Sequence, residues 1–319
     1  MMRLALCLLA LLCAAPAQAA SFYAGADDPY ALVRAEKISI TFAPKKRPLD
    51  LRVSWPVGPK ALPVIVFSHG AFGSRERYDP LVSYWVRHGY AVIQTTHSDS
   101  MKKGTLPFIR NPLVFREWHI RPEEISYVLT HLDDIAAALP DLPDMDRDRI
   151  AVAGHSYGAH TVMLLAGVTA QPKGKERRSF FDVRPKAYVM ISPQGTGGIF
   201  DAQSFKTIRG PALFVTGSND TVPGRKDVTP ESRLEPFLLS APEQKYLFFI
   251  QDAHHDFGGI SGARYRGMGP KDPAAMNMVR QITLAFFDAA LKNSPAARDL
   301  LENGDVGATT AGRAVLSRR

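Results

Sequence analysis

The stretch from Ile150 to His160, IAVAGHSYGAH, limits the possible folds more than any other part of the chain. A short apolar segment, 150–153, leads into Gly154-His155-Ser156-Tyr157-Gly158 and then into residues with helical character. Glycines two residues before and after a serine are typical of a sharp strand-to-helix turn, where a Cβ at either glycine would collide with neighbouring backbone. The pattern predicts a strand, a strained turn that exposes the serine hydroxyl, and a helix over 157–168.

Apolar segments of the kind found in buried strands recur on both sides of this turn. Their ranges are 63–68, 90–95, 187–192, 212–217 and 246–250, and two earlier strands are expected at 37–42 and 51–55. Segments with apolar residues at helical spacing lie at 80–88, 123–139 and 273–291. Strands that alternate with helices predict an α/β fold with a mainly parallel central sheet and helices on both faces, with ligands gathered at the carboxyl ends of the strands.

The composition is that of an ordinary globular protein, with 45% hydrophobic and 22% charged residues in a chain of 319. We predict a single domain over residues 20–292 and a C-terminal tail over 293–319, with a short helix followed by a loose end. Two long connections, 98–122 and 193–211, are expected to be binding loops or lids, because structureless connections of this length are uncommon in compact domains.

The first residues have the pattern of a secretory signal peptide over 1–19. Arg3 precedes an apolar run over residues 4–15, and Ala17-Gln18-Ala19 has the small-x-small form of a cleavage site. The run is shorter than the roughly 20 residues of a membrane-spanning helix. We therefore expect no membrane span, cleavage near Ala19 and a periplasmic or extracellular protein. Both cysteines, Cys7 and Cys13, lie in this segment, so no thiol chemistry is expected in the mature chain.

The formal net charge of +8 comes from dispersed basic residues. The densest groups, at 45–47, 173–178 and 318–319, are interpreted as solvated surface, with an attraction to anionic lipids, envelope polymers or acidic substrates as the alternative. No nucleic-acid-binding module accompanies them, so no nucleic-acid partner is expected. The sequence carries no signal for a particular oligomeric state.

A serine at a sharp turn needs two further residues before it can act as a nucleophile. Its hydroxyl is weakly nucleophilic at its free pKa, so an imidazole must take the proton and a carboxylate must orient the imidazole. Where the serine lies on a strand-to-helix turn, the carboxylate and then the histidine follow it in the chain. Asp220, which follows the strand over 212–217, is the favoured carboxylate, with Asp227 and Asp252 as alternatives.

The strand over 246–250 runs into two adjacent histidines, His254 and His255, and position alone leaves both open as the base. The serine also requires backbone N–H groups that stabilise an oxyanion. Tyr157 directly follows the serine, and Ala71 lies in the Gly-rich loop after the strand over 63–68. These two residues are the expected donors.

Four residues near the predicted strand ends are expected to line the substrate pocket. They are Phe72, His97, Trp118 and Phe257. The aspartates between 141 and 148 are interspersed with proline and arginine, which fits a polar turn better than a metal loop. No metal and no cofactor are predicted.

Together, these motifs resemble the α/β-hydrolase superfamily, in the branch of dienelactone-hydrolase-like proteins and bacterial platelet-activating-factor acetylhydrolase homologues. The likeness spans about residues 65–257. It rests on VFSHGAFGS, WVRHGYAVIQTTHSD, DRIAVAGHSYGAH, SPQG, VTGSND and an H-x-x-F-G-G segment at 254–259. Because relatives place the catalytic histidine before x-x-F, the resemblance favours His254. True dienelactone hydrolases use cysteine as the nucleophile, and this chain has Ser156, so their substrate is not carried over.

The resemblance implies the α/β-hydrolase fold and, more distantly, similarity to cutinases and polyester hydrolases. The predicted function is that of a secreted serine hydrolase, which cleaves small-molecule, lipid or polymer esters through an acyl-enzyme on Ser156. The predicted triad is Ser156, Asp220 and His254. An amidase or peptide hydrolase with the same triad is an alternative, because the triad does not distinguish an ester from an amide. A non-catalytic binding protein on the same fold is another.

Overall fold

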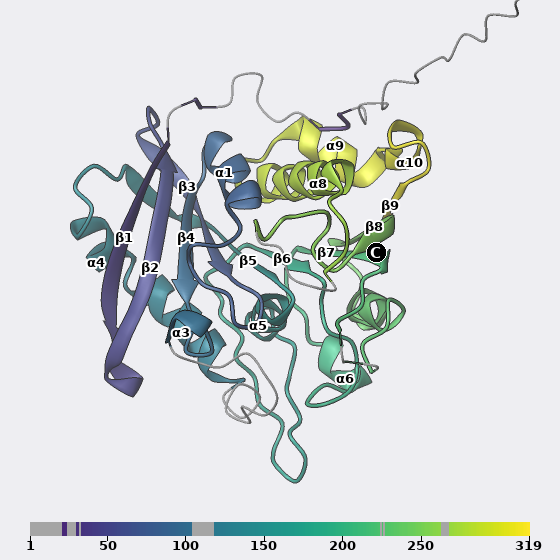
Figure 1. Ribbon diagram of the computed structural model, residues 1–319, viewed down its shortest axis with the longest axis horizontal. Helices are drawn as coiled ribbons and strands as arrows, with labels where there is room; N and C mark the ends of the chain where they lie inside the picture. The colour runs from purple at the N-terminus through teal and green to yellow at the C-terminus, as the bar shows by residue number, and fades with distance from the viewer. Residues whose placement is uncertain are drawn as a thin grey trace, which may run out of the picture.

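The computed structural model describes residues 21–23, 30–31, 33–103, 118–223, 225, 227–262 and 268–319. In this part of the chain nine strands form one sheet, in the order β1-β2-β4-β3-β5-β6-β7-β8-β9 (Figure 1). The predicted signal peptide lies outside the described residues. The strands are β1 Val33–Phe42, β2 Arg47–Pro56, β3 Ala61–Ser68, β4 Ala91–Thr96, β5 Asp144–His155, β6 Ala187–Ile191, β7 Ala212–Asn219, β8 Lys245–His254 and β9 Ala314–Arg318.

The sheet is parallel at its centre and antiparallel at both edges. Strands β4, β3, β5, β6, β7 and β8 run parallel to one another. Strands β1 and β2 on one side and β9 on the other pair antiparallel. All residues of β4 and β6 are buried, which fits the uninterrupted apolar sequence of β6, whereas β4 also buries the polar residues Gln94, Thr95 and Thr96. The predicted mainly parallel sheet is confirmed.

Helices cover both faces of the sheet (Figure 1). They are α1 Asp79–Arg87, α3 Ile120–Thr130, α4 Leu132–Ala137, α5 Tyr157–Leu165, α6 Ala202–Phe205, α7 Glu235–Leu239, α8 Pro273–Leu291, α9 Pro295–Asn303 and α10 Val306–Thr309. Helices α1 and α8 contribute Trp85 and Ile282 to one core, and α3 and α5 contribute Ile125 and Val162 to another. The two cores hold the strands between them, so the carboxyl ends of the parallel strands form a rigid edge.

The prediction of a loose C-terminal tail over 293–319 is wrong. This segment forms α9, α10 and β9, and β9 pairs with β8 from Tyr246↔Arg318 to Ile250↔Ala314. Leu301, Val306 and Ala314 are buried in the same core as α8. The domain therefore does not end at residue 292, because the last strand covers an edge of the sheet and its preceding helices bury apolar side chains.

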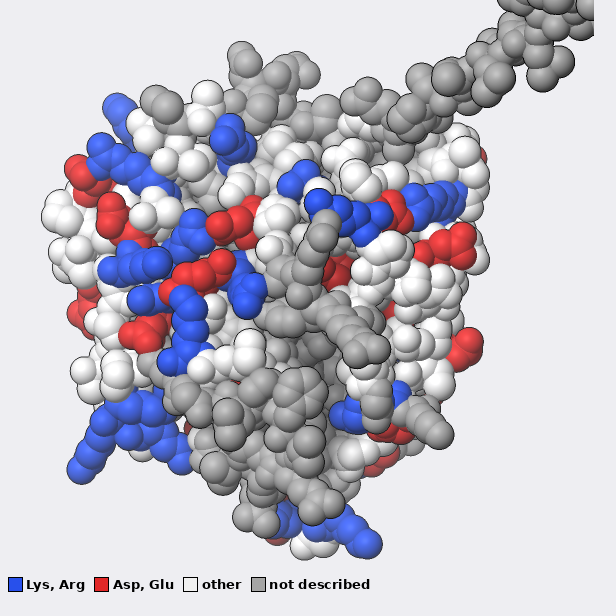
Figure 2. Space-filling model, viewed as in Figure 1, with Lys and Arg blue, Asp and Glu red and all other residues white. Residues whose placement is uncertain are grey.

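Charged side chains of both signs are interspersed on the face shown in Figure 2, in keeping with dispersed basic residues. A basic group at the lower left lies at the β1–β2 turn, where Lys45 and Lys46 are exposed. Among the described residues, no helix has both the length and the apolar character needed to cross a membrane.

Candidate active site

Ser156 lies at the turn between β5 and α5, at the carboxyl edge of the sheet. Its backbone has φ 57° and ψ −118°, a strained conformation for a residue with a side chain. A Cβ on Gly154 would lie 2.4 Å from the carbonyl carbon of Gly158, and a Cβ on Gly158 would lie 2.0 Å from the Ser68 carbonyl oxygen. Close approach of backbone on both sides therefore requires the two glycines and holds the strained serine in place.

His255 joins Ser156 to Asp220. Its Nε2 lies 2.9 Å from the Ser156 Oγ, and its Nδ1 lies 2.7 Å from Asp220 Oδ1. The serine is partly exposed, whereas the histidine and the aspartate are buried. The three residues come from the ends of β5, β7 and β8, and together they have the geometry of a nucleophile, a base and the carboxylate that orients the base.

This geometry corrects the sequence-based choice of His254 as the base. His254 is the last residue of β8, where it pairs with Asn219 of β7 and is partly exposed. Successive side chains along a strand point to opposite sides, so only one of two adjacent histidines reaches the serine. Of the alternative carboxylates, Asp252 is exposed and Asp227 forms a surface ion pair with Arg225.

Several buried groups keep the Asp220 carboxylate ionised. Burial raises the pKa of Asp220, but the Arg233 guanidinium and the hydrogen bond with His255 outweigh burial and lower that pKa to about 2. The hydroxyls of Ser192 and Thr216 donate to its other oxygen, at 2.6 and 2.9 Å. Asp220 is therefore a charged acceptor at every pH near neutrality, and it accepts a hydrogen bond from Nδ1 of the His255 ring.

Arg233 is a member of the site that the sequence analysis missed. Its guanidinium lies 3.0 Å from Asp220 Oδ1, donates to the Ser192 carbonyl at 2.8 Å and to the Pro193 carbonyl at 3.0 Å, and lies 3.3 Å from His255 Nδ1. It is 3% exposed. No motif surrounds it in the sequence, and its position in the connection between β7 and β8 offers no signal that it turns inward.

His155, between Gly154 and Ser156, links the base to the Gly-rich loop. The His255 carbonyl can only accept, so the proton of neutral His155 is on Nε2, which donates to that carbonyl at 2.8 Å. His155 Nδ1 therefore accepts from the Tyr78 hydroxyl at 2.9 Å, and this hydroxyl accepts from the Gly70 N–H at 3.0 Å. Burial and the nearby His255 lower the pKa of His155 to about 3, which keeps this link neutral.

The two predicted oxyanion donors belong to two segments that both adjoin the serine. A Cβ on Gly70 would be 3.5 Å from the Ser156 Cβ, so the loop after β3 lies against the serine. Ala71, the next residue in this loop, is exposed, and its N–H has no hydrogen-bond partner among the residues that the structure describes. Tyr157 is the first residue of α5, where the backbone N–H groups point away from the helix.

The four predicted pocket residues have different surroundings. Phe72 is partly exposed in the loop beside Ala71. Trp118 is 9% exposed and packs edge-on against Phe180. Phe257 is fully buried in the core with α8, and His97 is fully buried in hydrogen bonds with Ser68, Thr95 and Glu124. The structure therefore corrects the prediction for Phe257 and His97, which support the site from within the core.

Three comparisons with known proteins each find similarity, and these likenesses differ in strength. A family model for the alpha/beta hydrolase family matches residues 65–310. Platelet-activating factor acetylhydrolase of Cavia porcellus is 25% identical over 292 residues, which cover 76% of this chain and 61% of that protein. The chain thus spans less than two thirds of this relative's length.

A solved structure assigned as a dienelactone hydrolase of Klebsiella pneumoniae superposes with a TM-score of 0.56 and 18% identity. It covers 80% of this chain and 98% of that chain. At this identity the likeness concerns the fold alone. The three matches confirm the resemblance drawn from the sequence motifs.

Proposed function

Because the chain belongs to the alpha/beta hydrolase family, we propose that it is an exported serine hydrolase that cleaves carboxylic esters. The observation that supports this most directly is the unbroken hydrogen-bonded series of Ser156, His255 and Asp220 at the carboxyl edge of the sheet. Each member occupies the role that acyl transfer to a serine requires.

In the proposed reaction, His255 Nε2 takes the proton from the Ser156 hydroxyl while the serine oxygen attacks the ester carbonyl carbon. Asp220 holds the other ring nitrogen and stabilises the positive charge that forms on the imidazole. The protonated imidazole then gives its proton to the leaving alcohol, which breaks the ester bond and leaves an acyl-enzyme. Water, activated by the same histidine, releases the acid and restores the serine.

The negative charge that develops on the carbonyl oxygen is stabilised by the backbone N–H groups of Ala71 and Tyr157. Donors of this kind are typically worth about 3 to 4 kcal/mol each in the transition state. The open N–H of Ala71, in a loop packed against Ser156, is what supports its assignment.

The acetylhydrolase relative acts, by its name, on an acetyl group. Esters with short acyl groups, on phospholipid and on simple alcohols, are therefore the first substrates to assay. Export rests on the signal-peptide pattern over 1–19. It is tested by mass spectrometry of the protein made with its own leader, where a mature N-terminus near Ala20 is expected and an uncleaved chain would contradict it.

The decisive experiment treats the purified protein with a fluorophosphonate probe and assays p-nitrophenyl esters and matched amides. We expect covalent labelling that Ser156→Ala abolishes, and ester hydrolysis well above amide hydrolysis. His255→Ala should lower kcat by roughly 10⁴-fold or more, whereas the matched control His254→Ala should change it by less than about threefold, because His254 does not contact the serine. No labelling of the native chain would overturn the proposal.

A further inference from the structure

Buried side chains hold several backbone polar groups of the loop over residues 69–73. Gly70 donates its N–H to Tyr78 and Gly73 donates to the Gly70 carbonyl at 3.1 Å. The carbonyls of His69 and Gly70 accept from Arg121, and the Phe72 N–H donates to Asp99. Ala71 lies between these anchored groups and, among the described residues, has no partner for its own N–H.

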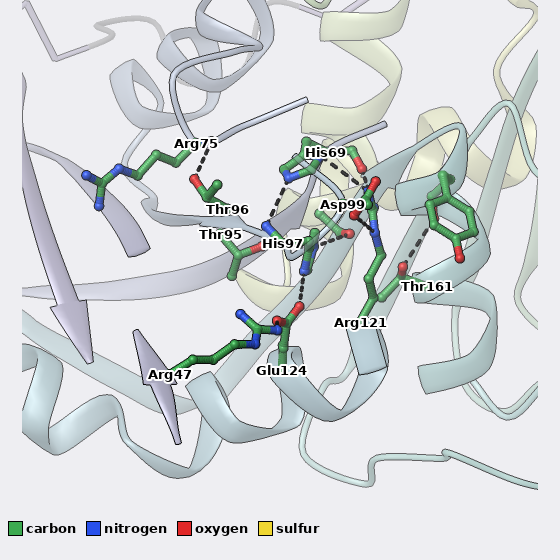
Figure 3. A network of polar contacts seen from close by, with 12 residues as sticks. Arg47, His69, Arg75, Thr95, Thr96, His97, Asp99, Arg121, Glu124 and Thr161 are labelled. Atoms are coloured by element: carbon green, nitrogen blue, oxygen red, sulfur yellow. Dashed lines mark hydrogen bonds and ion pairs between the residues drawn. The ribbon is translucent and has the colours of Figure 1, made fainter. Parts of the chain in front are cut away.

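Arg121 and Asp99 form a buried ion pair directly beneath this loop (Figure 3). The guanidinium donates to both carboxylate oxygens, at 2.9 and 2.7 Å, and the two residues are 2% and 7% exposed. Burial raises the pKa of Asp99, but Arg121 more than compensates and holds that pKa below its usual range. The pair is therefore charged, with both partners fixed by a bidentate contact.

Each partner of the pair fixes a different side of Ala71. Arg121 donates to the His69 carbonyl at 2.6 Å and to the Gly70 carbonyl at 3.3 Å, before Ala71 in the chain. Asp99 accepts from the Phe72 N–H at 3.1 Å, after Ala71. Phe72 has a φ of 63°, which a residue with a side chain adopts only when its surroundings enforce it.

A neighbouring contact gives His69 a fixed proton position. The His97 N–H donates to His69 Nε2 at 3.1 Å, so the proton of His69 lies on Nδ1 and is donated to the Gly70 carbonyl at 2.6 Å. Figure 3 shows the His69 and His97 rings beside the Arg121–Asp99 ion pair. The Gly70 carbonyl thus receives a side-chain donor from two directions, and its peptide group, which carries the Ala71 N–H, cannot turn freely.

Arg121 also touches the second oxyanion donor. Its guanidinium lies over the ring of Tyr157, 4.4 Å from the centroid. The buried side chain of Arg121 therefore contacts both the loop that carries Ala71 and the residue that begins α5. These contacts limit how far the two donors can move relative to each other.

We propose that Arg121 and Asp99 are positioning residues that hold the Ala71 N–H toward the developing oxyanion. The inference rests on the proposed ester hydrolysis and names the device that keeps its oxyanion hole preorganised. Neither side chain contacts the reacting atoms. A replacement pair that preserves the fold but frees the loop should therefore weaken transition-state binding while leaving substrate binding almost unchanged.

The test is the double variant Arg121→Gln/Asp99→Asn, which removes both charges together and leaves no unpaired buried ion. Glutamine is too short to reach both loop carbonyls. We expect kcat on a p-nitrophenyl ester to fall about 10- to 100-fold with KM within about threefold. The affinity for an alkylboronic acid, whose tetrahedral serine adduct places an oxygen in the oxyanion hole, should fall by the same factor as kcat.

The matched control is Arg184→Gln/Asp182→Asn. It removes a bidentate ion pair just before the start of β6. This pair lies at the amino ends of the parallel strands, whereas Ser156 lies at their carboxyl ends. We expect a lower melting temperature for this variant but kcat within about twofold of the native value. If the Arg121/Asp99 variant keeps native kcat and boronate affinity, or if the control loses as much activity, the inference is overturned. The proposed function fails separately, if the native chain neither reacts with fluorophosphonate nor cleaves esters.

Discussion

Replacing Arg233 by glutamine should make the stability of this protein depend on the charge of Asp220. In the native chain the pKa of Asp220 is about 2 against an ordinary value of 3.8. Its ionisation therefore stabilises the fold above pH 4, on the order of 2 kcal/mol, and this contribution is lost as the pH falls through 4 toward 2. Between pH 4.5 and 7.5 the native Asp220 adds no pH dependence.

In Arg233→Gln the carboxylate stays buried while its strongest opposing charge is gone. Burial then raises the pKa of Asp220 above its ordinary value. At pH 7 the loss of unfolding free energy should be about 3 to 5 kcal/mol, since a buried charge is left without its partner. As the pH falls to 4.5, Asp220 takes up a proton, and about 1 kcal/mol or more of the loss should be recovered.

Urea unfolding of the native and Arg233→Gln proteins, followed by tryptophan fluorescence from pH 4.5 to 7.5, measures this difference. Burial raises the pKa of Glu124 to about 7, but Glu124 titrates in both proteins and cancels in the comparison. The control Arg233→Gln/Asp220→Asn has no carboxyl to titrate and should give a loss that is flat with pH. A flat loss in Arg233→Gln itself would refute the reasoning.

Two further substitutions probe the backbone contacts around the serine. Tyr78→Phe removes the hydroxyl between Gly70 and His155, so the unfolding free energy should fall by about 1 to 3 kcal/mol because two buried groups lose their partner; an unchanged urea midpoint would contradict this. Gly158→Ala places a Cβ 2.0 Å from the Ser68 carbonyl oxygen, and we expect a loss on the order of 4 kcal/mol or more. A melting temperature within about 2 °C of native would show that the backbone relaxes without strain.

The elements that the sequence predicted well are those with local causes. The turn at Ser156 follows from two glycines that a close backbone approach demands, and the parallel strands follow from uninterrupted apolar runs. Asp220, expected after the strand over 212–217, directly follows β7 and lies 2.7 Å from His255 Nδ1, although the sequence paired it with His254.

The choice between His254 and His255 failed for a reason that local sequence cannot supply. The pairing of β7 with β8 shifts register between Gly217 and Asn219, and Asp252 has a φ of 59° just before the histidines. An irregularity of this kind reverses which of two adjacent side chains faces inward. It arises from contacts between strands that are far apart in the chain.

The buried arginines were missed for a related reason. Arg121, in the first turn of α3, and Arg233, between β7 and β8, lie outside any recognisable motif, and arginine is rarely buried unless it is paired. Their partners, Asp99 and Asp220, are 22 and 13 residues away along the chain. Only the folded backbone brings each pair together, so composition and spacing would assign both arginines to the surface.

The position of β9 bears on how the chain reaches its fold during synthesis. It is the last of the described strands to be made, and the backbone of Arg319 exchanges hydrogen bonds with Lys245 at the start of β8. Until these residues leave the ribosome, β8 is an unpaired edge able to associate with another chain. A truncation within β9 would therefore keep Ser156, Asp220 and His255 in the product, yet leave the edge of β8 unpaired and the protein prone to aggregate.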